Sequence, residues 1–105
     1  MARFDVFRNT GPHANTTPLL LDVQSNLLNG LDSCVVIPMR NTNQFPNVAL
    51  PTRLTPVFTI ANENYILETP KIAAIPRHLL KTPITSLADE QDRITAALDF
   101  LFQGY

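Results

Sequence analysis

The chain has 105 residues, of which 45% are hydrophobic and 16% are charged, so we expect one compact domain over residues 1–105 with a single core. Its 8 basic and 9 acidic residues give a formal net charge of −1, which argues against a general attraction to nucleic acid or to anionic membranes. No apolar run approaches the roughly 20 residues that cross a bilayer, and the N-terminus lacks a signal-peptide pattern. A cytoplasmic location is therefore predicted.

Cysteine and histidine are scarce. The chain has one cysteine, Cys34, and two histidines, His13 and His78. A single cysteine cannot form an internal disulfide, and these three residues are too few for a zinc site of the usual kind. No metal ion or other cofactor is predicted.

The N-terminal third reads as short strands separated by turns. Alternation over Arg3–Phe7 predicts a first strand with one buried face. The polar stretch Asn9–Thr17 predicts a mobile loop, and Leu19–Val23 predicts a second strand. Within Gln24–Gly30, the Asn-Gly pair predicts a turn that follows one helical turn.

The run Cys34–Ile37 is apolar at every position, which predicts a strand in the centre of the sheet. We expect Pro38 to close this strand, because proline cannot donate to a ladder of hydrogen bonds. The following stretch, Arg40–Arg53, is rich in Asn, Thr and Pro and predicts a long exposed loop.

A hairpin is predicted further along the chain. Its strands are Thr55–Ile60 and Tyr65–Thr69, joined by Ala61–Asn64. Ile72–Ile75 predicts one more short strand, ended by Pro76.

The C-terminal segment changes to the period of a helix. Ser86 and Asp89 have the spacing of a capping box, and acidic residues gather in the first turns, where the helix dipole favours them. One stripe of the helix carries Leu87, Ile94, Ala97, Leu98 and Leu101. Phe100 falls opposite this stripe and Phe102 on its margin, which predicts aromatic surface that a lone chain leaves exposed. Contact with a partner is favoured over the alternative, packing against a loop of the same chain.

Catalytic patterns are weak. Cys34 lies in the most apolar strand, where cysteine acts as a small hydrophobe, and both histidines read as surface residues without a motif. The carboxylates Asp89, Glu90 and Asp92 read as charges at a helix start, and three dispersed glycines cannot form a phosphate loop. The residues therefore favour a β-rich binding protein that is not an enzyme.

Several short segments, taken in order, resemble the CcdB family of toxins and cover nearly the whole chain. The resemblance rests on Phe4-Asp5-Val6-Phe7, Asp22-Val23-Gln24-Ser25 with Leu27-Leu28, Val36-Ile37-Pro38, Pro56 and Ile60, Leu67 and Thr69, Ile75-Pro76, and Ile94 through Ala97, Leu98 and Phe100-Leu101-Phe102 to Gly104.

The resemblance implies a mainly β fold with a C-terminal α-helix, in which an antiparallel sheet forms a small SH3-like barrel of the CcdB and MazF type. It implies a homodimer that binds the dimerisation region of the A subunit of DNA gyrase, trapping gyrase on cleaved DNA. It also implies a CcdA-like antitoxin that neutralises the toxin, and a toxin–antitoxin complex that represses its own operon in a plasmid-maintenance or chromosomal module.

Carried over residue by residue, the resemblance implies a gyrase-binding surface. Its members are Leu27, Leu28, Asp99, Phe102, Gln103, Gly104 and Tyr105. The best-known form of the family has Trp in place of Gln103, Asn in place of Asp99 and an aliphatic residue in place of Tyr105. Gln103 can hydrogen-bond but cannot stack on an arginine as Trp does.

Two alternatives stay open at this stage. The fold is shared with MazF-type toxins, which are endoribonucleases, and RNA cleavage that depends on Arg53 or Arg77 would favour this class. The second alternative is a CcdB homologue that has lost gyrase poisoning, suggested by Gln103 and Asp99. The antitoxin is expected to contact the loops Asn9–Thr17 and Arg40–Arg53 and the dimer surface near the helix.

Overall fold

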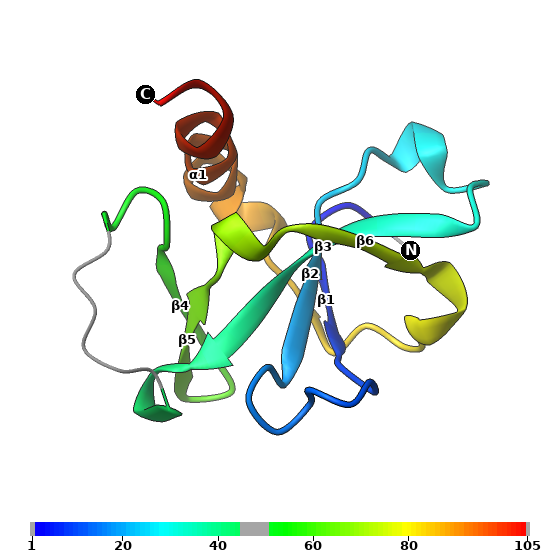
Figure 1. Ribbon diagram of the computed structural model, residues 1–105, viewed down its shortest axis with the longest axis horizontal. Coiled ribbons are helices and arrows are strands. Elements are labelled where there is room, and N and C mark those ends of the chain that lie inside the picture. The colour runs from blue at the N-terminus through cyan, green and yellow to red at the C-terminus, as the bar shows by residue number, and fades with distance from the viewer. Residues whose placement is uncertain (1, 45–50, 105) are drawn as a thin grey trace.

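A seven-stranded antiparallel sheet and one C-terminal α-helix form the fold, as seen in a computed structural model that describes residues 2–44 and 51–104 (Figure 1). The main strand order is β4-β5-β3-β2-β1-β7, and β6 pairs with β3 beside this path. The strands are β1 (Asp5–Arg8), β2 (Leu19–Asp22), β3 (Ser33–Asn41), β4 (Val57–Ile60), β5 (Glu63–Leu67), β6 (Ala73–Pro76) and β7 (Thr85–Ser86), and the helix is α1 (Gln91–Gln103). The predicted mainly β fold with a C-terminal helix is confirmed.

Strand β3 gives the sheet its curved, nearly closed form. One edge of β3 pairs with β2, whereas its other edge pairs first with β6 and then with β5. The sheet therefore forks around β3 and curls into a small barrel, with α1 beyond one end of β4 and β5 (Figure 1).

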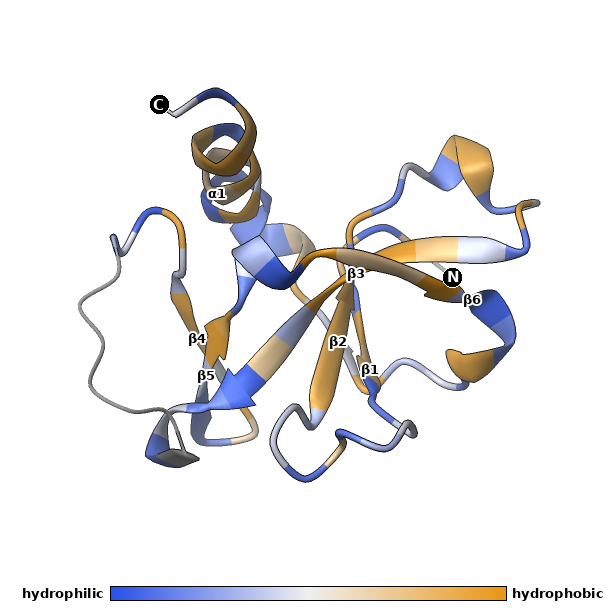
Figure 2. Ribbon diagram, in the orientation of Figure 1, coloured by the Kyte–Doolittle hydropathy of each residue, from blue (hydrophilic) through white to orange (hydrophobic). Residues whose placement is uncertain are grey.

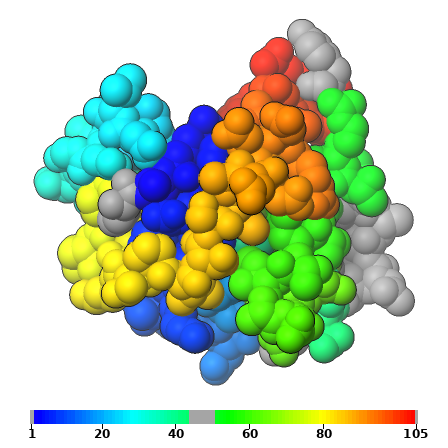
Figure 3. Space-filling view, turned by 180° about the vertical axis from the view of Figure 1, so that it is seen from behind, coloured from blue at the N-terminus to red at the C-terminus, as the bar shows by residue number. Residues whose placement is uncertain are grey.

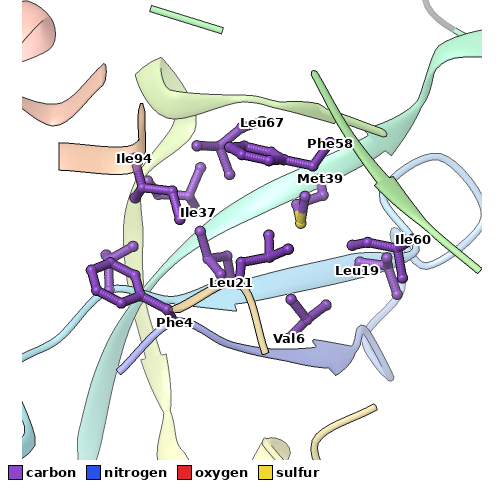
Figure 4. Packing of buried hydrophobic residues seen from close by; sticks show 12 residues of the cluster. Phe4, Val6, Leu19, Leu21, Ile37, Met39, Phe58, Ile60, Leu67 and Ile94 are labelled. Atoms are coloured by element: carbon purple, nitrogen blue, oxygen red, sulfur yellow. The ribbon is translucent and has the colours of Figure 1, made fainter. Parts of the chain in front are cut away.

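Two hydrophobic clusters lie on opposite faces of the sheet, where the sequence predicted a single core. The larger one holds residues of β1 to β5 together with Ile94 of α1 (Figure 4). The smaller one is built from Phe7, Leu20, Cys34, Val36 and Leu80.

The first strand therefore has two buried faces. The prediction of a single buried face was wrong, because Val6 enters the larger cluster while its neighbour Phe7 enters the smaller one. Phe4 is buried but precedes the strand, with a positive φ of 74°. Its amide donates to the Asp22 carbonyl at 2.7 Å, and its carbonyl accepts from the Leu87 amide at 2.8 Å, so the unusual backbone links three segments.

Pro38 does not close its strand, contrary to the prediction. Strand β3 continues to Asn41, so Arg40 and Asn41, which were expected in a loop, are strand residues. Along this edge of β3, the pairing with β6 reaches Val36 and the pairing with β5 starts at Met39, so Pro38 lies between the two partner strands. The Pro38 carbonyl accepts from the Glu68 amide at 2.9 Å. Proline has no N–H to donate, but its nitrogen faces the gap between the two partner strands, so the sheet loses no hydrogen bond there.

The predicted hairpin is confirmed as β4 and β5, with a tighter turn than expected. Ile60 pairs with Glu63, so the turn residues are Ala61 and Asn62 alone. Both have positive φ, 53° and 67°, as the two-residue type I′ turn requires.

The other connections follow the predictions in outline. The stretch Asn9–Thr17 forms turns, closed by the Asn9 side chain, whose Nδ2 donates to the Thr17 carbonyl at 2.8 Å. The one-turn helix predicted before Asn29-Gly30 is the 3₁₀ helix η1 (Asn26–Leu28). Part of the predicted loop Arg40–Arg53 lies outside the described residues.

The predicted capping box at the helix start is absent. The Ser86 hydroxyl accepts from the Ala88 amide at 3.1 Å, at the start of a preceding 3₁₀ turn, η5 (Ala88–Glu90), whose N-cap residue Leu87 has no side-chain cap. The α-helix begins at Gln91, with Glu90 at its N-cap position and no side-chain cap. The short η5 turn takes up the residues that the sequence pattern assigned to the first helical turn.

Two kinds of contact hold α1 against the barrel. Ile94 and Ala97 are fully buried, as the predicted apolar stripe requires. Arg93 makes polar contacts as well. Its guanidinium donates to the Glu90 carboxylate at 2.7 Å and to the Val57 carbonyl of β4 at 2.8 Å. The central carbon of the guanidinium lies 4.4 Å from the centre of the Phe58 ring. The last turns of α1 therefore extend from a fixed base.

Candidate functional site

The turn that carries Leu27 and Leu28 projects from the sheet and buries none of its side chains. Leu27 is 93% exposed and Leu28 is 45% exposed. Ser25 starts the turn, because its hydroxyl accepts from the Leu27 amide at 3.2 Å. Figure 2 shows this turn as a hydrophobic segment at the margin of the molecule.

The end of α1 is a second exposed feature. Asp99 and Gln103 are exposed, and Phe102 is 71% exposed. Gly104 ends the helix in the left-handed conformation with a φ of 81°, and its amide donates to the Phe100 carbonyl at 2.9 Å. A hydrophobic ring held at a rigid helix end and left uncovered by its own chain is typical of a contact surface.

The two aromatic residues near the helix end differ. Phe102 is exposed, as predicted, whereas Phe100 is only half-exposed and has the Arg53 guanidinium 5.5 Å from its ring centre. The sequence pattern placed Phe100 on the outer side of the helix but could not show that a distant arginine covers it. The predicted site residue Tyr105 lies outside the described residues.

The two exposed features lie toward the same end of the molecule but on different sides of it. Figure 1 places the η1 turn and the end of α1 on opposite sides of the upper rim, and Figure 3 shows them separated from behind as well. One chain therefore presents Leu27 and Leu28 apart from Asp99, Phe102, Gln103 and Gly104. The structure does not gather the described members of the predicted site into one pocket.

Cys34 is confirmed as a structural residue. Its side chain is fully buried in the smaller cluster. Burial, reinforced by the neighbouring Asp22 carboxylate, raises the pKa of the Cys34 thiol to about 12. The thiol therefore stays protonated at neutral pH and is a poor nucleophile.

The other catalytic candidates do not assemble. His13 and His78 are exposed, as predicted. Among residues 2–44 and 51–104, no three His, Cys, Asp or Glu side chains are placed to hold a metal ion. Within the same residues, no helix is long and apolar enough to span a membrane.

The two arginines named for RNA cleavage already have structural contacts. Arg53 lies over the Phe100 ring. Arg77 donates to the backbone carbonyl of Leu31 at 2.8 Å and to that of Ser33 at 3.4 Å. Arg53 therefore packs on α1, and Arg77 holds the backbone between Leu31 and Ser33.

Asp22 is a buried carboxylate that the sequence interpretation missed. It is 1% exposed, its Oδ1 accepts from the Gln24 amide at 2.9 Å, and it faces the Cys34 thiol. Burial raises the pKa of Asp22, and the hydrogen bonds from Gln24 and Cys34 oppose this effect only in part. A lone acidic residue directly after three leucines was the available sequence signal.

Replacing Asp22 with Asn is expected to make the protein more stable at neutral pH. Because the native pKa is raised, the native state binds more protons than the unfolded state between the ordinary and the raised pKa, so wild-type stability falls as pH rises through that window. The asparagine side chain keeps an oxygen for the Gln24 amide but carries no charge. Urea unfolding at several pH values should show an advantage for Asp22→Asn at neutral pH that vanishes below the window; a less stable variant at neutral pH would contradict the assignment.

Comparison with known proteins gives one family. The family model described as "CcdB protein" matches residues 3–104. No curated protein matches the chain. The matched range spans both exposed features, from the first strand to the glycine that ends the helix.

Proposed function

The chain belongs to the CcdB family, which supports the role of a toxin in a toxin–antitoxin module, and from this premise we propose that it poisons DNA gyrase. Residues 1–105 act as a single CcdB-like toxin domain in the cytoplasm. Two chains form a homodimer, and the homodimer binds the dimerisation region of the A subunit of DNA gyrase.

Exposed apolar surface at two fixed positions is the observation that supports this proposal most. The 93% exposed Leu27 and the 71% exposed Phe102 bury little against their own chain. Large side chains left in water on a short turn and at a helix end are explained by a partner that covers them. The proposed gyrase-binding set is Leu27, Leu28, Asp99, Phe102, Gln103, Gly104 and Tyr105.

The proposed mechanism is binding, without catalysis by the toxin. A ligand that binds one state of an enzyme more tightly than another shifts the population toward the first state. Binding to gyrase while its DNA is cleaved therefore delays religation. Asp99 favours a contact with a basic side chain, Gln103 supplies hydrogen bonds, and Gly104 allows a close approach of the backbone.

Regulation by an antitoxin completes the proposal. A CcdA-like antitoxin neutralises the toxin by binding the loop Asn9–Thr17, the segment Arg40–Arg53, which begins with the last residues of β3, and the dimer surface near the helix. The toxin–antitoxin complex represses its own operon, as in plasmid-maintenance modules. A crosslinking map of the toxin–antitoxin complex that places the antitoxin away from these segments would overturn this assignment.

Gyrase-dependent DNA cleavage in vitro tests the proposed function. Purified protein added to gyrase, ATP and circular DNA is expected to increase linear DNA after denaturation of the gyrase, and it should leave DNA uncleaved when gyrase is omitted. No increase at saturating protein would overturn gyrase poisoning and favour a homologue without this activity. Cleavage of RNA by the purified protein would favour the endoribonuclease class.

A further inference from the structure

Arg77 joins the end of β6 to the turn that presents Leu27 and Leu28. Its Nε donates to the Leu31 carbonyl at 2.8 Å, and its Nη2 lies 3.4 Å from both the Leu28 and the Ser33 carbonyl oxygens. Its own amide donates to the Asp32 carbonyl at 2.7 Å. One residue thus binds four backbone carbonyls across residues 28–33.

Gln24 holds the same turn from its other end. Its Nε2 donates to the Ser33 carbonyl at 3.1 Å and to the Leu28 carbonyl at 3.4 Å, while its Oε1 accepts from the Val35 amide at 3.1 Å. The Leu28 and Ser33 carbonyls therefore accept from both side chains.

The turn has little stability of its own. Its helical part is the three-residue η1, with no buried side chain. Its backbone bonds include those from the Leu28 amide to Ser25, from the Asn29 amide to Asn26 and from the Leu31 amide to Leu28. A 3₁₀ turn of this length without packing is not stable in water, so its conformation depends on the side chains that bind its carbonyls.

We propose that Arg77 is a positioning residue for gyrase recognition, which holds the Leu27–Leu28 turn in its binding conformation without touching gyrase. This inference rests on the proposed function, because it assigns a role to the turn that the proposal places at the interface. Figure 3 shows the turn (cyan) projecting directly beside the chain segment (yellow) that follows β6.

The chemistry of the contacts requires an arginine. A guanidinium is planar and offers five N–H donors in a fixed fork, so it reaches several carbonyls at once. A lysine in the same place has one ammonium on a flexible stem and cannot reproduce the contacts to Leu28, Leu31 and Ser33 together. The charge alone is therefore not sufficient, and Arg77→Lys tests the geometry with the charge retained.

Two measurements on the purified full chain test the inference. Hydrogen exchange at the amides of Leu28 and Leu31 should become faster in Arg77→Lys than in the wild type. Affinity for the dimerisation fragment of gyrase A should fall about tenfold, the size expected for the loss of charge-assisted contacts that preorganise a binding loop. Arg8→Lys is the matched control, because Arg8 is exposed at the end of β1 and should change neither quantity.

A double-mutant cycle separates positioning from general destabilisation. If Arg77 acts through the turn, Arg77→Lys should weaken binding much less in a Leu27→Ala background than in the wild type. Additive losses would overturn the inference, and so would unchanged exchange at Leu28 and Leu31. If the wild type does not bind gyrase A, the proposed function fails, and the exchange rates alone then decide whether Arg77 holds the turn.

Discussion

Replacing Gly104 with Val is expected to abolish toxicity while the protein stays folded. Gly104 has a φ of 81°, a conformation that costs an L-residue about 1–2 kcal/mol and a β-branched residue more. A Cβ at this position meets no atom within 4 Å, so the fold itself has room for the side chain. The variant should redirect the backbone after Phe102 and change the surface offered to gyrase, as measured by survival of cells after induction.

Gly104→Asn is the matched control for this prediction. Asn adopts the left-handed conformation more readily than Val does, so it adds a side chain while the helix end keeps its shape. Partial toxicity in Gly104→Asn would assign the effect to conformation, and full loss would assign it to close approach of the backbone. Full toxicity of a folded Gly104→Val would remove the helix end from the proposed site.

Replacing Ile94 with Ala is expected to give a large loss of stability. Ile94 is fully buried and joins α1 to the larger hydrophobic cluster (Figure 4). Truncation of such a side chain costs about 2–5 kcal/mol, which is a large part of the stability of a small domain, about 5–15 kcal/mol. Urea unfolding should therefore show a clearly lower midpoint, and toxicity should fall because less folded toxin is present.

Ile84→Ala makes the same chemical change on the surface. Ile84 is 40% exposed, so its truncation should change stability by less than about 1 kcal/mol. Ile94→Val should fall between the two, at about 0.5–1.5 kcal/mol. Equal losses for Ile94→Ala and Ile84→Ala would contradict the view that α1 is anchored through Ile94.

Period and turn chemistry were sufficient to predict most of the fold. The β4–β5 hairpin and the apolar stripe of α1 depend on neighbours close in the chain. The hairpin is confirmed, and so is the buried part of the stripe at Ile94 and Ala97, whereas Leu87, predicted on the stripe, precedes the helix. The errors arose where distant segments decide the outcome. Phe7 is buried because a second cluster forms on its face, and Pro38 is tolerated because two partner strands leave a gap beside it.

Less of the candidate site than of the fold could be predicted from the sequence. Leu27 and Leu28 were named through the family resemblance, and their exposure became visible only in the structure. The exposure of Phe102 was predicted from the helical period before the resemblance was used. The roles of Gln24 and Arg77 could not be predicted, because their side chains bind backbone carbonyls, which any residue type provides. Arg77 and Leu31 are 46 positions apart in the sequence, and no local pattern links them.

Induced expression in two otherwise identical bacterial strains tests the central claim most directly. One strain carries normal gyrase, and the other carries a gyrase A that resists CcdB. We predict killing of the first strain and growth of the second. Killing of both strains would indicate a target other than the CcdB contact on gyrase A, and growth of both would contradict gyrase poisoning by this chain.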